Sequence, residues 1–393
     1  MSGNVAKPDL WSIRRVVPRL MILYLVLDLV LRLVPVDPLT FRAWEAMLRH
    51  WPNAVGPFIP NKHYHREDSY GGVASIGNLP ALREYRVADF TTDAYGFHNP
   101  PALANGEPVG IVVGDSFAVG SELAENETLS AQLSRRCGKY FYNAGSPQPL
   151  RLRSVEAVAQ RLHLQHGVVI FEFLEARALQ APPATTPEGA KGKLQGLVFR
   201  TLGTEWTDRL ATPVNELHAS PLEALAVKLQ KRLQNGWLLP NSFVHFVIED
   251  RLRNGEPIVF LPAEFLSPSE PQKAAAEWAA YFAWYATELR KDGLELTVLL
   301  VPNRSTVYGP LLEPPRDVSS SVTTLADFQG ALDQAGVSVV NLESQFADQA
   351  PRLLGHKRYL YFLDDTHWTG AGTTIAGEQV LSRLSVSLAC RQQ

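Results

Sequence analysis

The chain has 393 residues and a formal net charge of −3, with 46% hydrophobic and 20% charged residues. This composition is typical of a globular protein and excludes an intrinsically disordered chain. The basic residues are spread along the sequence, which argues against a nucleic-acid-binding protein, because such proteins concentrate positive charge on one face.

The N-terminal 36 residues have the pattern of a membrane anchor. Three arginines precede an apolar run at residues 20–36, within which Asp28 and Arg32 stand four residues apart. A helix of this length spans roughly 25 Å, and the pairing of the two charges on one face lowers their cost in a bilayer. No small-residue cleavage motif follows. We therefore predict an uncleaved signal anchor at residues 1–36, the alternative being a helix that lies on a membrane or packs on the protein.

Residues 37–104 are rich in Pro, Gly and aromatic residues, and we expect them to form an extension that packs on the core. From residue 105 to residue 393 apolar strands alternate with helices, a pattern that predicts a parallel sheet covered on both faces. Residues 174–292 interrupt this alternation and are interpreted as a helical insertion, with one helix at 220–236 and another that stops at Gly293.

The fold class predicted for residues 105–393 is therefore α/β, with a central parallel sheet of about five strands. The predicted strands are 109–113, 140–143, 168–173, 294–301 and 337–342, and the predicted core helices are 127–138, 153–167 and 370–384.

Cysteine and histidine spacing gives no metal pattern. Cys137 and Cys390 are far apart and form no zinc motif, and the sequence leaves open whether they pair in an oxidising compartment. His63 and His65 flank a tyrosine, but no third ligand stands at helical or hairpin spacing. We therefore expect an ordinary polar loop there, with no metal site and no cofactor.

A candidate serine site joins two distant segments. The first strand ends in Gly-Asp-Ser-Phe, which places Ser116 at the carboxyl edge of the sheet, where open α/β folds bind ligands. A serine needs a neighbouring base and an acid that orients the base. The segment Asp-Asp-Thr-His-Trp supplies His367, with Asp364 and Asp365 three and two residues before it. The alternatives are a helix cap for the serine and a loop ion pair for the other residues.

This combination of motifs resembles the SGNH (GDSL-type) hydrolase superfamily. With Val-Pro-Asn-Arg-Ser-Thr-Val-Tyr-Gly at residues 301–309, it is similar to the SGNH-like polysaccharide O-acetyltransferases of the alginate acetylation type, over roughly residues 105–180 and 290–390. The resemblance implies a flavodoxin-like three-layer sandwich. It also implies that Ser116 is the nucleophile and His367 the general base, with Asp365 favoured as the acid over Asp364.

The resemblance further implies an oxyanion hole formed by the backbone N–H groups of Ser116 and Gly145. Two such donors can each contribute roughly 2.7–4 kcal/mol to transition-state stabilisation. The superfamily usually offers an asparagine after the third strand, but this chain has Phe-Glu-Phe-Leu-Glu-Ala-Arg there. Candidates for the remaining donor are Arg177, Asn143 and Asn303.

Three further residues are candidates for contact with substrate. Arg304 and Tyr308 are expected to contact a sugar or an acyl group, with a structural role equally open. Trp368 is expected either to pack in the core or to form a platform beside the histidine.

These features predict an SGNH-type serine enzyme, most simply an O-acetyltransferase that modifies a cell-surface or exported polysaccharide through an acyl-enzyme. A carbohydrate acetylesterase with the same triad, a non-catalytic glycan-binding scaffold and a lipid esterase are the alternatives. The resemblance implies that a multi-pass membrane acyltransferase delivers the acetyl group. With the predicted anchor, we expect the chain at the inner membrane, with its main domain in the periplasm.

Overall fold

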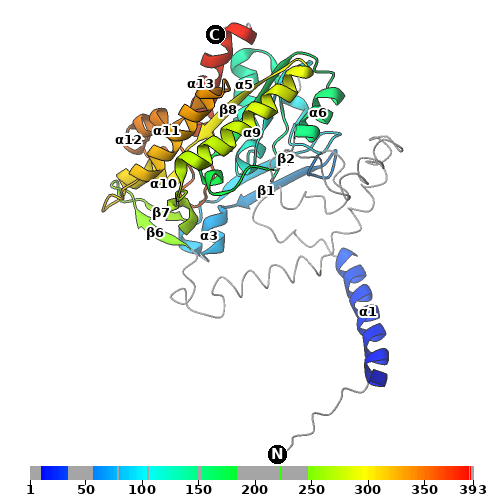
Figure 1. The fold of residues 1–393 in the computed structure, drawn as a ribbon. Coiled ribbons are helices and arrows are strands. Elements are labelled where there is room, and N and C mark those ends of the chain that lie inside the picture. Colours follow the sequence, from blue (N-terminus) through cyan, green and yellow to red (C-terminus); the bar gives the residue numbers. More distant parts are fainter. Residues whose placement is uncertain are drawn as a thin grey trace, which may run out of the picture.

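A five-stranded parallel sheet lies at the centre of the protein (Figure 1). The computed structural model describes residues 10–33, 56–77, 79–103, 106–147, 152–183, 222, 247–388 and 390. From edge to edge the strands are β4 (Tyr140–Asn143), β3 (Pro108–Val113), β5 (Gly167–Leu174), β8 (Leu294–Val301) and β9 (Ser338–Asn341). When these five strands are numbered by their order in the chain, the order across the sheet is 2-1-3-4-5, which is the flavodoxin-like arrangement. The predicted parallel sheet of about five strands is confirmed.

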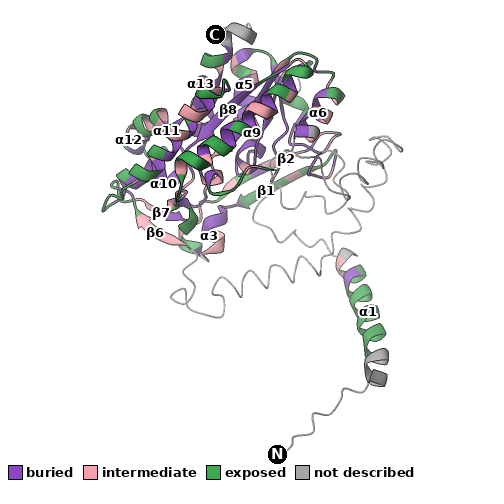
Figure 2. Cartoon of the chain, viewed as in Figure 1, coloured by how far each residue is buried: buried purple, intermediate pink, exposed green. Residues whose placement is uncertain are grey.

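Helices cover both faces of the sheet, so the domain has three layers (Figure 2). Strand β5 shows the division, since Val169 and Phe171 pack in one apolar cluster and Val168 and Ile170 in the other. The first cluster includes α6 (Leu152–Arg161), α9 (Pro271–Lys291) and α11 (Ser319–Gln334). The second includes α5 (Leu129–Cys137), α12 (Glu343–Leu354) and α13 (Gly370–Leu388).

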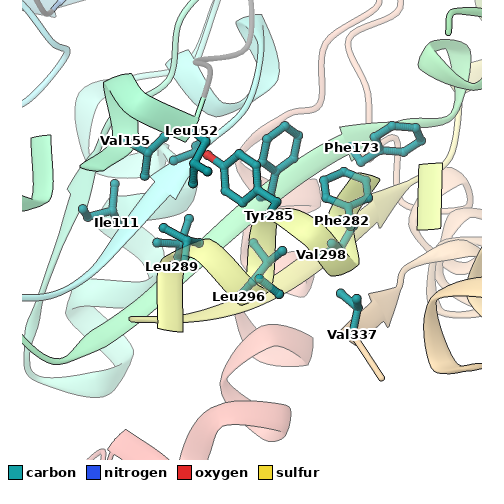
Figure 3. Packing of buried hydrophobic residues seen from close by; sticks show 14 of the residues in the cluster. Ile111, Leu152, Val155, Phe173, Phe282, Tyr285, Leu289, Leu296, Val298 and Val337 are labelled. Atoms are coloured by element: carbon teal, nitrogen blue, oxygen red, sulfur yellow. The ribbon is translucent and has the colours of Figure 1, made fainter. Parts of the chain in front are cut away.

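The longest core helix, α9, shows how the first layer packs (Figure 3). Its Phe282, Tyr285 and Leu289 are fully buried and lie over Leu296 and Val298 of strand β8. Full burial of an apolar side chain of this size contributes roughly 1.5–3 kcal/mol. The repeated aromatic residues of this helix therefore belong to the core.

Local signals explain where the elements begin and end. The strands predicted at 140–143 and 294–301 have those bounds in the structure. Helix α5 begins after Thr128, whose hydroxyl accepts the Ala131 N–H, and ends at Gly138, which has a positive φ of 70°. The helix predicted at 153–167 ends earlier, at Arg161, and His163 then adopts a φ of 54° as the chain turns towards β5.

The insertion between β5 and β8 is not purely helical. Its described part contains a two-stranded antiparallel sheet, β6 (Ile248–Arg251) and β7 (Pro257–Phe260), before α9. Asn254 and Gly255 lie between these strands, and Gly255 has a φ of 87°. Asn-Gly is a strong hairpin signal that the helical interpretation overlooked. The helix predicted at 220–236 lies outside the described residues, except for Leu222.

The segment predicted to anchor the chain forms helix α1 (Leu10–Leu33). Of the helices in the described ranges, none combines the length and the apolar character that crossing a membrane requires. Asp28 and Arg32 both belong to α1 and make it more polar. The predicted signal anchor is therefore not confirmed.

The segment before the sheet contains a second antiparallel pair, β1 (His63–Ser69) and β2 (Arg86–Thr91), with the short helix α3 (Gly72–Ile76) between them. The inner face of β2 packs Ala88 and Phe90 against Phe58 and Val119. Val119 belongs to α4 (Ser116–Val119), which starts at the candidate nucleophile. The extension is thus in direct contact with the helix that carries Ser116.

A disulfide joins Cys137, at the end of α5, to Cys390, which lies beyond α13. The bond closes a loop of 253 residues, which restricts the unfolded chain. We expect Cys390→Ser to lower the free energy of unfolding by about 2–5 kcal/mol, measured by urea denaturation. Dithiothreitol should lower the free energy of unfolding of the wild type by a similar amount. It should leave that of the variant unchanged, because the chain has only these two cysteines. Equal sensitivity of both proteins to the reductant would contradict the assignment.

Candidate active site

Three predicted site residues meet at the carboxyl edge of the sheet. Ser116 follows β3, whereas Asp365 and His367 lie in the loop before α13. His367 Nε2 is 2.7 Å from Ser116 Oγ, and His367 Nδ1 is hydrogen-bonded to Asp365 Oδ1. This is the spatial order of a serine, a histidine and an acid in serine hydrolases. The histidine and the aspartate are buried, while the serine is partly exposed.

The turn that presents Ser116 depends on Gly114 and Asp115. The Asp115 carboxylate accepts the Phe117 N–H at 3.0 Å and so caps the first turn of α4. A Cβ atom on Gly114 would lie 2.4 Å from Oε2 of Glu172, so this position has no room for a side chain. The sharp change from strand to helix thus requires these two residue types.

Trp368 joins the loop of the acid and the base to the helix of the serine. Its side chain is fully buried, and its Nε1 donates to the Phe117 carbonyl at 3.2 Å. The two rings meet edge to face, with 5.5 Å between their centroids. Trp368 therefore packs in the core of this structure, and its fully buried side chain presents no surface on which a substrate could stack.

Asp365 is the carboxylate next to the histidine. One oxygen contacts the His367 ring and also accepts the His367 backbone N–H at 3.0 Å. The other oxygen accepts the backbone N–H of Gly72. Both oxygens thus have donors, although the side chain is fully buried.

Asp364 points to a different set of partners. Its carboxylate accepts the backbone N–H groups of Gly71 at 2.7 Å and Glu84 at 2.9 Å, and it forms an ion pair with Arg86. Burial and the charge of Asp364 raise the pKa of Glu84. The geometry therefore places Asp365, rather than Asp364, next to the histidine.

The expected oxyanion donors are not equally available. The Gly145 N–H donates to Asn143 Oδ1 at 2.8 Å, and the Asn143 amide nitrogen donates to the Val119 carbonyl at 3.4 Å. A Cβ atom on Gly145 would lie 2.3 Å from the Val119 nitrogen, so this glycine is needed for close packing against α4. Ser116 is the first residue of α4, where backbone N–H groups have no partner within the helix. Of the two expected backbone donors, the Ser116 N–H is therefore the one that remains available to an oxyanion.

Two other donor candidates have structural roles. Arg177 forms an ion pair with Asp115, with 2.8 Å between Nη2 and Oδ2. The Asn303 side chain accepts the Ala176 N–H at 3.1 Å and donates to the Glu264 carbonyl at 3.4 Å. Neither side chain is directed at Ser116 through these contacts, so neither replaces the missing superfamily asparagine in this conformation.

Arg304 and Tyr308 lie beneath the site rather than in contact with substrate. Arg304 is 1% exposed, and its guanidinium donates to the carbonyls of Phe362 and Asp365. It also pairs with Glu264 at 3.1 Å. Tyr308 is fully buried, and its hydroxyl accepts a backbone N–H from the same loop. Because their polar atoms hold the loop of the candidate acid and base, the structure favours the structural role of these residues over contact with a sugar or an acyl group.

Glu172 is a buried residue of the site that sequence reasoning missed. It lies in β5 with no exposed surface, and its Oε2 accepts the Asp115 N–H at 3.0 Å. Burial, with a smaller contribution from Asp115, raises the pKa of Glu172 well above its usual value. The signal in the sequence was a single acidic residue inside an otherwise apolar strand. By accepting the Asp115 N–H, the Glu172 carboxyl group supports the turn that presents the serine.

The structural role of Arg304 can be measured. Arg304→Ala removes the partner of buried Glu264 and the donors to the loop carbonyls, so we expect the free energy of unfolding to fall by about 3–5 kcal/mol. Urea denaturation measures the change, and Arg253→Ala, on an exposed arginine, should change it by less than about 0.5 kcal/mol. Unaltered stability of Arg304→Ala with a raised KM would instead favour contact with substrate.

The raised pKa of Glu172 predicts how stability changes with pH. Above the usual glutamate pKa the unfolded chain loses this proton while the folded chain keeps it, so the contribution of Glu172 to stability decreases as the pH rises. In Glu172→Gln the side chain is neutral in both the folded and the unfolded chain. The free energy of unfolding of the variant relative to that of the wild type should therefore rise by up to about 1.4 kcal/mol per pH unit. Urea denaturation between acidic and alkaline pH tests this, with Glu277→Gln, on an exposed helix face, as the control. A constant difference across the range would show that Glu172 is ionised in the folded protein.

Comparison with known proteins adds one family match. Residues 258–392, about a third of the chain, match the SGNH hydrolase-like domain of the acetyltransferase AlgX. No curated protein matches the chain.

Two solved structures are similar at low levels. The acetyl xylan esterase AlAXEase has 7% identity and a TM-score of 0.33, and the match covers 70% of this chain and 98% of the esterase chain. A carbohydrate acetylesterase family member from Sinorhizobium meliloti has 10% identity and a TM-score of 0.31, and the match covers 72% of this chain and 99% of that protein. Such TM-scores carry no weight for the activity. The matched segment contains both Asp365 and His367, and over these residues the chain resembles the SGNH hydrolase-like domain of AlgX.

Proposed function

We propose that the protein is a serine O-acetyltransferase that acts on a polysaccharide, with Ser116 as nucleophile, His367 as general base and Asp365 as the orienting acid. The observation that carries the proposal is the 2.7 Å contact between His367 Nε2 and Ser116 Oγ, with the opposite ring nitrogen bonded to a buried carboxylate. Similarity of residues 258–392 to an acetyltransferase domain supports an acyl-ester enzyme.

The first half-reaction forms an acyl-enzyme. His367 Nε2 takes the proton of Ser116 Oγ as that oxygen attacks the carbonyl carbon of an acetyl ester. The tetrahedral intermediate collapses, the bond to the leaving oxygen breaks, and His367 returns its proton to that oxygen. Ser116 then carries the acetyl group as an ester.

The second half-reaction releases the acetyl group to a sugar. A sugar hydroxyl loses its proton to His367 and attacks the acetyl carbonyl carbon, and Ser116 Oγ leaves with the proton that His367 returns. Water in place of the sugar would make the same site a carbohydrate acetylesterase. The partial exposure of Ser116 favours this second candidate, because it gives small nucleophiles access.

Asp365 has an electrostatic and an orienting role in both steps. Its contact with Nδ1 holds a proton on that nitrogen, so that Nε2 is free to accept from the serine. The carboxylate also stabilises the imidazolium that forms. The backbone N–H of Gly72 fixes the second carboxylate oxygen and keeps the acid in place.

The Ser116 N–H is the proposed first oxyanion donor. The Gly145 N–H can join it when the Asn143 side chain rotates and releases the hydrogen bond that it now accepts. Donors directed at the developing oxyanion rather than at the ground-state carbonyl lower the barrier.

The setting of the reaction is part of the proposal. The disulfide between Cys137 and Cys390 supports an oxidising compartment, such as the periplasm. By resemblance to the alginate-type enzymes, a separate multi-pass membrane acyltransferase supplies the acetyl donor. The acceptor is a cell-surface or exported polysaccharide.

Substitution of the nucleophile tests the proposal. We expect Ser116→Ala to lower kcat for a chromogenic acetyl ester by at least about 10³-fold, and Asp365→Asn to lower it by about 10³–10⁴-fold. Ser382→Ala, on the exposed face of α13, should retain the wild-type rate. Rates of acetate release measure these effects.

Mass spectrometry identifies the intermediate and the acceptor. An acetyl group should appear on the peptide that contains Ser116 after rapid acid quenching, and acetylated product should appear when oligosaccharides are added. Acetate release alone would select the acetylesterase. A wild-type protein that binds oligosaccharide but neither releases acetate nor becomes acetylated would overturn the proposal in favour of a glycan-binding scaffold.

A further inference from the structure

The outer face of the β1–β2 pair gathers two histidines and a carboxylate. Alternate residues of a strand point to the same side, which places His63 and His65 together on the exposed face. In the antiparallel register His65 lies opposite Asp89, and His63 lies opposite Thr91. The three side chains are 56%, 49% and 38% exposed for His63, His65 and Asp89.

The ligand atoms of these three residues converge. His63 Nε2 is 3.6 Å from Asp89 Oδ1, and His65 Nδ1 is 2.7 Å from the same oxygen. Each of the three residues offers one ligand atom that lies within 4.8 Å of those of the other two. A tetrahedral ion with ligand bonds of about 2.0–2.2 Å holds neighbouring ligand atoms about 3.4 Å apart. The first distance fits this spacing, and a small rotation of the half-exposed His65 ring brings the second to it.

Thr91 fixes the orientation of one ligand. Its hydroxyl is 2.8 Å from His63 Nδ1, which leaves Nε2 of the same ring turned towards Asp89. In metal sites the second nitrogen of a ligating histidine almost always has a hydrogen-bond partner, which sets the tautomer and the ring orientation. The hydroxyl occupies that position here.

We propose that His63, His65 and Asp89 form a binding site for a divalent transition-metal ion of the zinc type. Two imidazole nitrogens and one carboxylate oxygen suit Zn²⁺, and water would complete the coordination. The site was not expected from the sequence, because Asp89 stands 24 positions after His65 and becomes a third ligand only when β1 pairs with β2.

The ion would tie β1 to β2. Beyond its last residue, Ser69, β1 leads to Gly71 and Gly72, and β2 begins at Arg86. These three residues hold the carboxylates of Asp364 and Asp365 through the contacts described above. A metal on the outer face would therefore stiffen the support of the candidate triad.

Zinc titration of the tag-free full-length chain, after treatment with a chelator, tests the proposal without an activity assay. Calorimetry should show one Zn²⁺ ion bound per chain, and saturating Zn²⁺ should raise the midpoint of thermal unfolding. We expect His63→Ala and Asp89→Asn each to weaken zinc affinity at least tenfold and to remove the rise in the midpoint. Thr91→Val should weaken affinity by about tenfold.

His356→Ala, which alters an exposed histidine outside the cluster, is the matched control and should bind zinc as the wild type does. Asp89→Asn keeps the size of the side chain, so its loss of binding would not reflect a failure to fold, and circular dichroism checks this. The proposal is overturned if the wild type binds no stoichiometric zinc, or if the cluster variants bind it as tightly as the control. Either result is independent of whether the protein transfers acetyl groups.

Discussion

Two adjacent carboxylates, Asp364 and Asp365, lie fully buried where the loop before α13 meets the edge of the sheet. Removing charges from water costs several kcal/mol each unless hydrogen bonds and opposite charges compensate. The compensation comes from the extension, through the backbone N–H groups of Gly71 and Gly72 and the guanidinium of Arg86. The segment before the sheet is therefore a structural requirement of the site rather than an appendage.

The same loop is held from below by Arg304. Its guanidinium donates to loop carbonyls, including that of Asp365, while Glu264 balances its charge. Because the carbonyls are satisfied from this side, the loop has a fixed conformation, and His367 projects towards Ser116. An arginine beneath the loop and amide groups beside it thus orient the imidazole together.

The parts of this arrangement that depend on local sequence were predictable. Short apolar runs between the predicted helices located the strands, and the order of the Ser116 and His367 motifs indicated which loops meet. The residues alone left the acid open between Asp364 and Asp365, and only the family resemblance favoured Asp365. The choice depends on a tertiary contact, since the Asp365 carboxylate lies next to His367 while that of Asp364 contacts the extension. The burial of Arg304 and Tyr308 was missed for a similar reason: a polar residue after a strand is normally exposed, and only tertiary contacts reveal the carbonyls and the amide that bury these two.

The match to the AlgX domain, over residues 258–392, includes the proposed acid and base but not the proposed nucleophile. Ser116 follows β3 in a turn whose Asp115 N–H donates to the buried carboxyl group of Glu172, and the backbone N–H that donates to the second oxygen of Asp365 belongs to Gly72. The carboxyl edge of a parallel sheet brings these segments together, since every strand of such a sheet ends on the same side. A graft of the matched segment alone would therefore carry a histidine and a buried carboxylate with no serine to activate and with no donor for the second carboxylate oxygen. The sheet and the extension together are therefore needed to assemble the proposed triad.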